Sequence, residues 1–345
     1  MVDTLDYSRF RFEAVIDWLR IAICTARSTN LQAVRNCIAE ELGIRVHVEP
    51  FDADSNPLPK GSANSPASHF QITLQDPQGW HQVDAPLKRL EAHYGFTAHP
   101  MVIGAEIAFD AYSAGASPSE MALLSAAFCK FQINPVSENR RVVGVWSGKP
   151  RAKGLSGVKY GELCGLMEKG ASVYFGSQRD MPEHSIVKTP ISQRAYFKRT
   201  TTAKGQVEQL EECEWRSRLE LTLQMGERGL TGKDGLPCTD WRHWQEYRFE
   251  TLRGGKHFRF MKFKDNLEDQ QLSSSDRKRL DDMNDSTQVG EWREAKRKQA
   301  DGRIVRTPQH DRFLQADAEL NERARRALRK LTREWRKEQT PVKRK

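Results

Sequence analysis

The segment Met101–Tyr112 reads MVIGAEIAFDAY, a strongly apolar stretch that carries the acids Glu106 and Asp110. In an extended chain, successive side chains point to opposite faces, so Ile107 and Phe109 share the core-facing side and Glu106 lies on the other. If that other face is solvated, the acid is ordinary. If it is covered, the carboxylate needs a cation or a metal ion, because an unpaired buried charge is costly. The segment predicts a β-strand at the centre of a sheet.

A second segment, Leu219–Leu223 (LELTL), repeats this pattern, because it also places one acid, Glu220, inside an apolar strand. Two halves that each contribute such a strand would form a pseudo-twofold sheet. Glu106 and Glu220 are therefore the first candidates for ligands of Mg²⁺ or Mn²⁺, the ions that carboxylates hold in phosphodiester chemistry. Asp110 ranks below them, because four residues of strand separate it from Glu106 by about 13 Å.

The rest of the pattern predicts an α+β protein built on a largely antiparallel sheet. A capping box at Ser117–Glu120 begins a helix that ends before Pro135. Residues 148–157 are expected to form a basic loop, and Asp240–Leu252 an aromatic helix. Further strands are expected at Phe12–Cys24, Ile44–Val48, His69–Gln75, Arg141–Trp146, Ala171–Gly176, Ile191–Lys198 and Trp215–Met225, and further helices after Asn30 and at Ala85–Tyr94.

Charge is concentrated in the last residues of the chain. The net charge is +9. Residues 321–345 hold eleven Lys or Arg against three Glu, or +8, which leaves about +1 for the first 320. We expect a catalytic domain over residues 1–265 and a basic tail over residues 266–345, mostly helical or partly disordered. Such tails usually bind nucleic acid and less often an anionic membrane.

Other features of the sequence bear on its compartment. No stretch approaches 18 consecutive apolar residues, and the N-terminus lacks the pattern of a signal peptide. The six cysteines form no CxxC pair and have no histidine spacing that is typical of zinc sites. We therefore expect a cytoplasmic protein with reduced thiols and no membrane segment.

The segment Gln193–Arg199 (QRAYFKR) places a tyrosine between two cations at alternating positions. On a strand, Arg194, Tyr196 and Lys198 share one face, so a hydroxyl nucleophile lies between two phosphate-binding groups. The lysine charge would also favour the phenolate form of the tyrosine. Taken alone, the segment is better explained as a half-exposed strand with solvated charges.

Residues Lys256–Lys264 (KHFRFMKFK) alternate basic and aromatic side chains, which suits a platform for single-stranded nucleic acid. A sheet strand with solvated ends explains the pattern equally well. The candidate DNA-binding residues of this segment are Lys256, Arg259, Lys262 and Lys264. The charged helix expected at Arg312–Lys337 would add salt-sensitive affinity that does not depend on sequence.

Five short segments, in this order, resemble the replication initiation factors of rolling-circle plasmids and filamentous phages, a family related to the relaxases of some integrative elements. The matching segments are Ile16–Leu19 (IDWL), Glu106–Asp110 (EIAFD), Val173–Ser177 (VYFGS), Arg194–Lys198 (RAYFK) and Arg218–Leu221 (RLEL). The resemblance covers about residues 10–225. Phe197 stands where the family has an acid, and Gly104 where it often has an arginine.

The resemblance implies a reaction at a replication origin. Tyr196 would attack a DNA phosphodiester and leave a covalent phosphotyrosine link and a free 3′-OH. Arg194 and Lys198 would bind the phosphate, Glu106 and Glu220 would hold the metal ion, and Arg218 would contact DNA. The nick site would be single-stranded or a hairpin. A host helicase and a homodimer are further expected partners.

Several alternatives remain at this point. Tyr174 is the rival nucleophile, although its apolar flanks favour a core aromatic. A relaxase of a mobile element would use the same chemistry. A non-catalytic DNA-binding regulator would need no tyrosine, and a metal-dependent nuclease that activates water would leave no covalent adduct.

Overall fold

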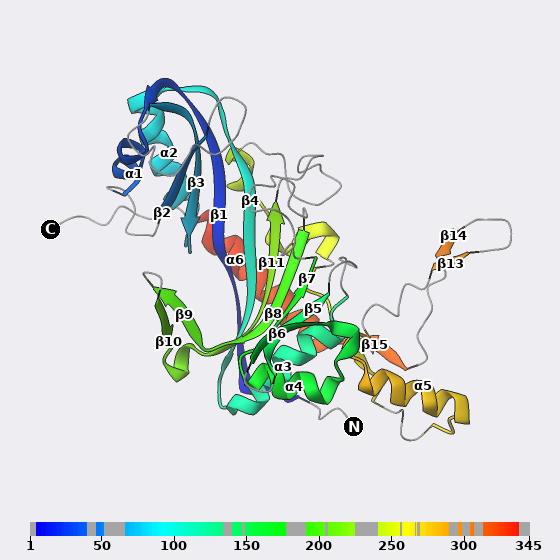
Figure 1. Ribbon diagram of the computed structural model, residues 1–345. Helices are drawn as coiled ribbons and strands as arrows, with labels where there is room; N and C mark the ends of the chain where they lie inside the picture. Colours follow the sequence, from blue (N-terminus) through cyan, green and yellow to red (C-terminus); the bar gives the residue numbers. More distant parts are fainter. Residues whose placement is uncertain are drawn as a thin grey trace.

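The structure is a computed structural model, and its main element is a nine-stranded sheet that joins both halves of the sequence (Figure 1). The strand order is β2-β3-β1-β4-β11-β8-β7-β5-β6, and every pairing in it is antiparallel. The predicted α+β class is confirmed. The structure describes the chain outside residues 1–4, 40–45, 52–65, 134–139, 147–148, 177–190, 204–205, 225–240, 256, 266, 268–269, 290–295, 299–303, 307–312 and 338–345.

The sheet strands are β1 (Phe10–Thr29), β2 (Val46–Phe51), β3 (Ala67–Gln75), β4 (Phe96–Ser113), β5 (Arg141–Trp146), β6 (Lys149–Gly154), β7 (Ser172–Phe175), β8 (Ile191–Lys198) and β11 (Arg216–Gln224). The α-helices are α1 (Leu31–Ala39), α2 (His81–Tyr94), α3 (Pro118–Phe131), α4 (Tyr160–Glu168), α5 (Ser274–Asp285) and α6 (Ala318–Arg336). The short pairs are β9 (Thr200–Ala203) with β10 (Gln206–Gln209), β12 (Met261–Phe263) with β15 (Leu314–Ala316), and β13 (Lys296–Lys298) with β14 (Ile304–Arg306). The 3-10 turns are η1 (Tyr7–Arg9), η2 (Leu155–Gly157), η3 (Glu212–Glu214), η4 (Trp241–Trp244) and η5 (Phe249–Gly255).

The two strands that carry the acids, β4 and β11, are neighbours in the middle of the sheet. Ile107 pairs with Leu221, and Glu106 and Glu220 each precede that pair on their own strand. A local twofold axis through the pair therefore relates the two acids and keeps them on one face. Farther out, the chain runs helix, hairpin, helix in each half: α1, β2–β3 and α2 in the first, and α3, β5–β6 and α4 in the second. In the first half the second strand of the hairpin, β3, joins the rest of the sheet, whereas in the second half the first strand, β5, does so. The twofold relation is thus confined to the central strands.

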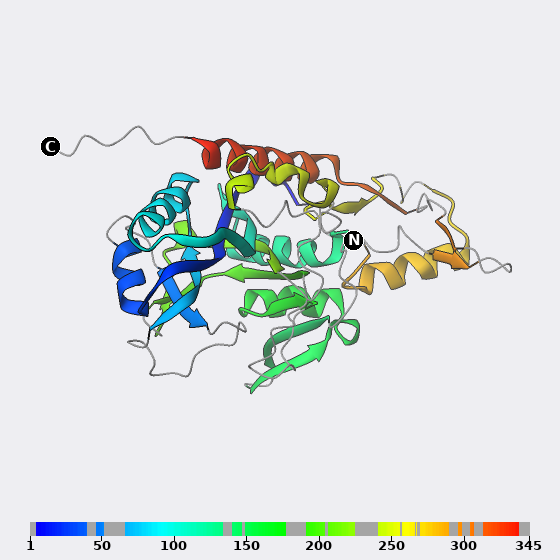
Figure 2. The same ribbon diagram turned by 90° about the horizontal axis from the view of Figure 1, so that it is seen from above.

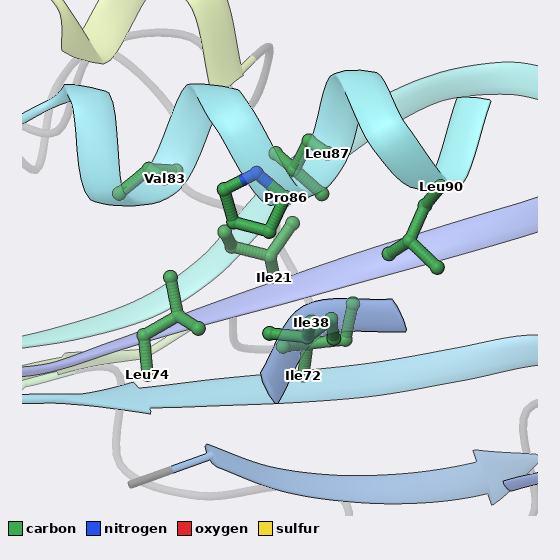
Figure 3. A pocket seen from close by; sticks show the side chains of 8 residues that line it. All are labelled: Ile21, Ile38, Ile72, Leu74, Val83, Pro86, Leu87 and Leu90. Carbon is green, nitrogen blue, oxygen red and sulfur yellow. The ribbon is translucent and has the colours of Figure 1, made fainter. Parts of the chain in front are cut away.

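The other face of β4 and β11 is apolar and packs against α3. The ring centroids of Phe109 and Phe128 are 5.6 Å apart, and both side chains are buried. The predicted capping box is confirmed, because the Ser117 and Glu120 side chains each accept a hydrogen bond from the other's backbone. Helices α1 and α2 lie together at the other end of the sheet (Figure 1). Between α2 and the sheet, aliphatic side chains enclose a void of about 10 Å³, which is a packing gap rather than a ligand site (Figure 3).

Helix α6 covers the part of β1 that lacks a partner on one side. Pairing with β3 begins at Trp18, so residues 10–16 pair only with β4. The helix packs against this free edge and against η5 (Figures 1 and 2). Its Trp335 indole donates a hydrogen bond of 2.7 Å to the carbonyl of Trp244. Covering an exposed edge in this way prevents edge-to-edge pairing. The domain division at residue 265 stays a prediction, and α6 shares the core of residues 1–265.

Three local expectations differ from the structure. Residues 149–154 form strand β6 rather than a loop; its side chains are all exposed, so no apolar alternation marks it. Within Asp240–Leu252 the described residues form 3-10 turns η4 and η5 rather than an α-helix, with Trp241, Trp244 and Phe249 buried. Helix α4 and the β9–β10 hairpin are elements that the sequence does not predict, whereas α5 lies in the tail expected to be mostly helical. Among the described helices, none has a stretch long and apolar enough to cross a membrane.

Candidate active site

Strand β8 presents the predicted trio on one face. Its residues alternate between buried and partly exposed, and Arg194, Tyr196 and Lys198 are all partly exposed. Phe197 points to the opposite side, is 3% exposed and packs edge-on against Trp215. An acid at position 197 would therefore face the core, which explains why phenylalanine is suitable there.

Glu220 links this trio to β11. The register places Glu220 opposite Arg194, and its side chain is 1% exposed. The Tyr196 hydroxyl donates a hydrogen bond of 2.6 Å to one carboxylate oxygen, and Arg194 Nε donates one of 2.7 Å to the other. Arg194 Nη2 also lies 3.1 Å from the Tyr196 hydroxyl oxygen. The candidate nucleophile, a carboxylate and a guanidinium thus form one closed hydrogen-bonded group.

A β-bulge in β1 adds a third acid. Ile16 pairs with Ile107 and Trp18 with Glu106, so Asp17 is the extra residue between two consecutive partners. The bulge turns its side chain to the charged face, as bulges near active sites often do. Carboxylate oxygens of Asp17, Glu106 and Glu220 all lie within 4.8 Å of one another. Asp17 was quoted in the IDWL segment but was not selected as a site residue, because a bulge cannot be read from the sequence.

Arg218 lies on the same face of the sheet and holds the acids by hydrogen bonds. Its guanidinium donates two hydrogen bonds of 2.6 Å to Asp110, and Nη1 lies 2.7 Å from Asp17 and 3.4 Å from Glu220. Arg218 is 2% exposed and Asp110 0%. Arg218 is therefore buried among carboxylates and does not present a surface to DNA. Asp110 is held through both oxygens and lies outside the three-carboxylate cluster, whose third member is Asp17.

The acids of the cluster differ in protonation. Burial acts to raise the pKa of Asp17, but the charges of Arg218 and Lys198 outweigh it, so this pKa lies below its usual value. Burial, and then the charge of Glu220, raise the pKa of Glu106 to about 8. The Thr222 hydroxyl donates a hydrogen bond to Glu106. At neutral pH without a cation, Glu106 is therefore mostly protonated while Asp17 is ionised.

Tyr196 is neutral in this arrangement, contrary to the expected phenolate. Burial and the adjacent Glu220 carboxylate raise its pKa, and together they outweigh the opposing charges of Arg194 and Arg218. Burial, and then Arg218 and Arg216, lower the pKa of Lys198. The face therefore combines a protonated phenol, a carboxylate that accepts its hydrogen bond, and an ammonium group that gives up its proton more readily than a free lysine.

The cluster fits a divalent cation. Oxygen is the preferred donor of Mg²⁺ and Mn²⁺, and two ligands on opposite sides of Mg²⁺ lie about 4.2 Å apart, close to the 4.8 Å limit of these oxygens. Burial and the Glu220 charge favour the protonated form of Glu106, and a bound cation would favour its ionised form. Asp17, Glu106 and Glu220 are thus the residues that would hold a metal ion.

Tyr174 does not behave as a core aromatic. Strand β7 pairs Tyr174 with Arg194, and its side chain is partly exposed while Val173 and Phe175 are buried. The Arg194 guanidinium lies 4.4 Å from the centre of the Tyr196 ring and 5.9 Å from that of Tyr174. Apolar flanks suggested a buried ring, but in an alternating strand those neighbours face the opposite side. Both tyrosines therefore lie on the charged face.

The position of Gly104 also has a structural reason. A side chain there would meet the Trp18 ring at 3.0 Å and the Leu223 carbonyl at 3.3 Å. Arg20 lies opposite Gly104 on β1, stacks over Trp18 at 4.9 Å, and interacts electrostatically with Glu106. A cation from β1 thus lies near the acid, where the family often has an arginine on the acid's own strand.

The expected aromatic platform is not formed. Within residues 257–264, only Met261–Phe263 form a strand, β12. Phe258 and Phe260 are buried, and their ring centroids lie about 6 Å from that of Phe109, at 6.0 and 6.2 Å. These aromatics complete the core and cannot stack on bases. Of the cations proposed there, Lys262 pairs with Asp265 at 2.7 Å, Arg259 is exposed, Lys264 is partly exposed, and Lys256 lies outside the described residues.

Comparison with known proteins gives little guidance. No known protein family matches the sequence, and no curated protein matches it. Among solved structures, the rolling circle replication initiator protein from Geobacillus stearothermophilus is similar at a TM-score of 0.29 and 11% identity, over 62% of this chain and 75% of that one. Aspartate kinase from Synechocystis is similar at 0.17 and 9% identity, over 63% of this chain and 53% of that one. Both scores are below 0.5, so we base the functional assignment on the site.

Proposed function

We propose that the protein is a DNA-nicking enzyme that cleaves a phosphodiester through a tyrosine nucleophile, with Tyr196 as the attacking residue and a divalent metal ion as cofactor. The observation that carries this proposal is the closed group of Tyr196, Glu220 and Arg194 beside a cluster of three carboxylates. Phosphoryl transfer needs a nucleophile, a proton acceptor and positive charge around one phosphate, and these residues supply each part.

The first half of the reaction uses contacts already present. Tyr196 Oη attacks phosphorus, and its proton passes to the Glu220 oxygen 2.6 Å away. Arg194, at 3.1 Å, stabilises the charge that develops on the phenol oxygen. The bond between phosphorus and the 3′ oxygen breaks, and Lys198, whose pKa is lowered, donates a proton to that oxygen. The products are a phosphotyrosine diester and a free 3′-OH.

A divalent cation bound by Asp17, Glu106 and Glu220 would polarise a phosphoryl oxygen and offset charge on the transferring group. The protein's own residues keep these acids in place. Arg218 fixes Asp17 and Glu220, and Thr222 orients Glu106. Glu106 must lose its proton to act as a ligand, so cation binding releases a proton near neutral pH.

The biological use of this reaction is a finer part of the proposal. The order of the five family-like segments supports initiation of rolling-circle replication, and strand transfer by a mobile-element relaxase would use the same site. Residues of all five segments lie on neighbouring strands, because β1, β4, β11, β8 and β7 are consecutive in the sheet.

The test is an incubation with supercoiled DNA from the protein's own replicon and Mg²⁺ or Mn²⁺. The proposal expects an SDS-stable protein–DNA adduct that disappears with Tyr196→Phe and persists with Tyr112→Phe, a matched change at a tyrosine at the far end of β4. Loss of the adduct only with Tyr174→Phe would identify Tyr174, on the neighbouring strand β7, as the nucleophile. Cleavage without any adduct would indicate a nuclease that activates water, and tight binding without cleavage would indicate a regulator.

A further inference from the structure

A groove runs between α6, the first residues of β1 and η5, along the free edge of the sheet. It has a volume of about 810 Å³. Eight of its thirteen lining residues are Lys or Arg and only Glu250 is acidic, so the groove is strongly electropositive. The cations that α6 contributes are Arg323, Arg326, Arg329, Lys330, Arg333 and Arg336.

The groove exists because α6 has two different faces. Its apolar side chains are buried against the core: Leu320, Leu328, Leu331 and Trp335. The cations therefore project away from the core, along a line of about 20 Å from Arg323 to Arg336. Arg11 from β1 and Arg248, the residue before η5, add two more positive charges. Phe12 contributes to the lining beneath Arg323, whose guanidinium is 5.4 Å from the ring centre.

The carboxylates around the groove do not neutralise it firmly. Several exposed pairs lie within α6, for example Arg323–Glu319 at 2.7 Å and Arg326–Glu322 at 2.9 Å. Longer contacts join Lys330 to Glu13 and Arg336 to Glu246, both at 3.5 Å. Such pairs are weak in water and exchange readily for a phosphate. Arg329 and Arg333 are exposed, and neither forms an ion pair with a described acidic residue.

We propose that this groove binds the phosphate backbone of duplex DNA, independently of base sequence. One strand of B-DNA carries a phosphate for each 3.4 Å of helix axis, so about 20 Å of duplex offers about six phosphates to the six cations of α6. A lipid surface is a poorer fit, because a membrane-bound helix must insert its apolar face and that of α6 is already buried in the core.

The groove lies within reach of the candidate active site. Arg11 lines the groove and Asp17 belongs to the carboxylate cluster, and both lie on the charged face of β1, six positions apart. Six residues of strand span about 20 Å, which equals about six base pairs of duplex. A duplex held by α6 would therefore place a melted or extruded strand next to Tyr196. This role rests on the proposed function, whereas the binding itself does not.

The experiment measures binding alone, in EDTA, so that no nicking occurs. A fluorescent duplex of arbitrary sequence, about 30 base pairs long, is titrated with wild type, with the Arg329→Glu/Arg333→Glu variant, and with a matched Lys149→Glu/Arg151→Glu variant on the exposed strand β6. The α6 variant should lose at least about tenfold in affinity at about 0.1 M salt, and its slope of log affinity against log salt should fall by about 1.8, since two phosphate contacts are lost. The β6 variant should stay within about twofold of wild type.

Equal losses in the two variants would overturn the proposal, because net charge rather than the groove would then govern binding. It would also be overturned by an unchanged α6 variant, or by binding to phosphatidylserine vesicles without binding to duplex. The substituted residues are exposed, and matching thermal unfolding of the variants confirms that they are folded. A groove that binds duplex in a protein that forms no covalent adduct would refute the proposed function only. An adduct with unaltered duplex binding in the α6 variant would refute the groove only.

Discussion

The two charged regions of this protein hold their charges in opposite ways. At the carboxylate cluster, Glu220 and Arg218 are almost fully buried. Glu220 accepts several hydrogen bonds from neighbouring groups, and Arg218 donates several to neighbouring carboxylates. Along α6, Arg329 and Arg333 are exposed at the surface. A buried charge acts strongly on its neighbours, because the surroundings screen it poorly, whereas an exposed charge acts mainly on a polyanion at its surface. The first region therefore suits chemistry and the second suits sequence-independent binding.

The largest expected effect comes from Glu220→Gln. Loss of this charge leaves Arg194 without its only carboxylate partner among the described residues, and it weakens the hold on Arg218. Removing a buried acceptor of charged hydrogen bonds typically costs about 3 kcal/mol or less, and we expect a loss of about 3 kcal/mol in the free energy of unfolding. Denaturant unfolding measures it.

The control for this change is Glu208→Gln on the exposed strand β10, which should alter stability by less than about 0.5 kcal/mol. If the two variants were equally stable, the charges at the cluster would be as loosely held as those at the surface, and the contrast between the two regions would be lost.

Removal of Asp17 should separate stability from metal binding. Asp17→Asn keeps the shape of a partly exposed side chain but removes one of three anionic ligands. Wild type should gain about 2.7 kcal/mol of stability at Mn²⁺ concentrations 100-fold above its Kd, and the variant should gain clearly less at the same concentration. Thermal unfolding with and without Mn²⁺ measures both values. Equal gains would exclude Asp17 as a ligand.

The metal-free protein should lose stability as pH rises from about 4.5 to about 8. The pKa of Glu106 is raised from 4.5 to about 8 on folding, so within this window the folded state binds more protons than the unfolded state. One such group contributes at most about 1.4 kcal/mol per pH unit, and neighbouring groups add their own slopes. Glu106→Gln should flatten the curve in this window. An unchanged slope in that variant would show that Glu106 titrates normally.

The smallest expected effect on stability belongs to α6. The Arg329→Glu/Arg333→Glu variant should change the free energy of unfolding by less than about 0.5 kcal/mol, because exposed charges contribute little to it. Denaturant unfolding at two salt concentrations checks this. A loss of several kcal/mol would mean that these arginines hold the helix in place, and their role would then be structural rather than in binding.

The sequence alone predicted those features of the fold and site that leave a periodic pattern of apolar and charged residues. Alternation in MVIGAEIAFDAY and LELTL identified the two central strands and their acids, because one apolar face and one charged face leave a period of two in the sequence. The same rule placed Arg194, Tyr196 and Lys198 together. Neither Asp17 nor the partner of Arg218 could be found in this way, since a bulge and a strand order come from tertiary packing.

The wrong predictions for Tyr174 and for residues 257–264 also arise from tertiary packing. Tyr174 was assigned to the core from its apolar neighbours, although alternation places it on the charged face once β7 pairs with β8. The basic and aromatic residues 257–264 suggested a stacking platform, but the space beside Phe109 takes up Phe258 and Phe260. Whether such an aromatic side chain is buried or exposed depends on the assembled sheet, and the local sequence does not describe that assembly.

The central claim is that Tyr196 becomes joined to DNA, and mass spectrometry of the adduct tests it most directly. After nuclease and trypsin treatment, Tyr196 lies in the peptide AYFK, residues 195–198, and Tyr174 in GASVYFGSQR, residues 170–179. The proposed mechanism expects the nucleotide on AYFK, in a sample prepared with Mg²⁺ or Mn²⁺. A nucleotide on GASVYFGSQR, or on neither peptide despite efficient cleavage, would contradict it.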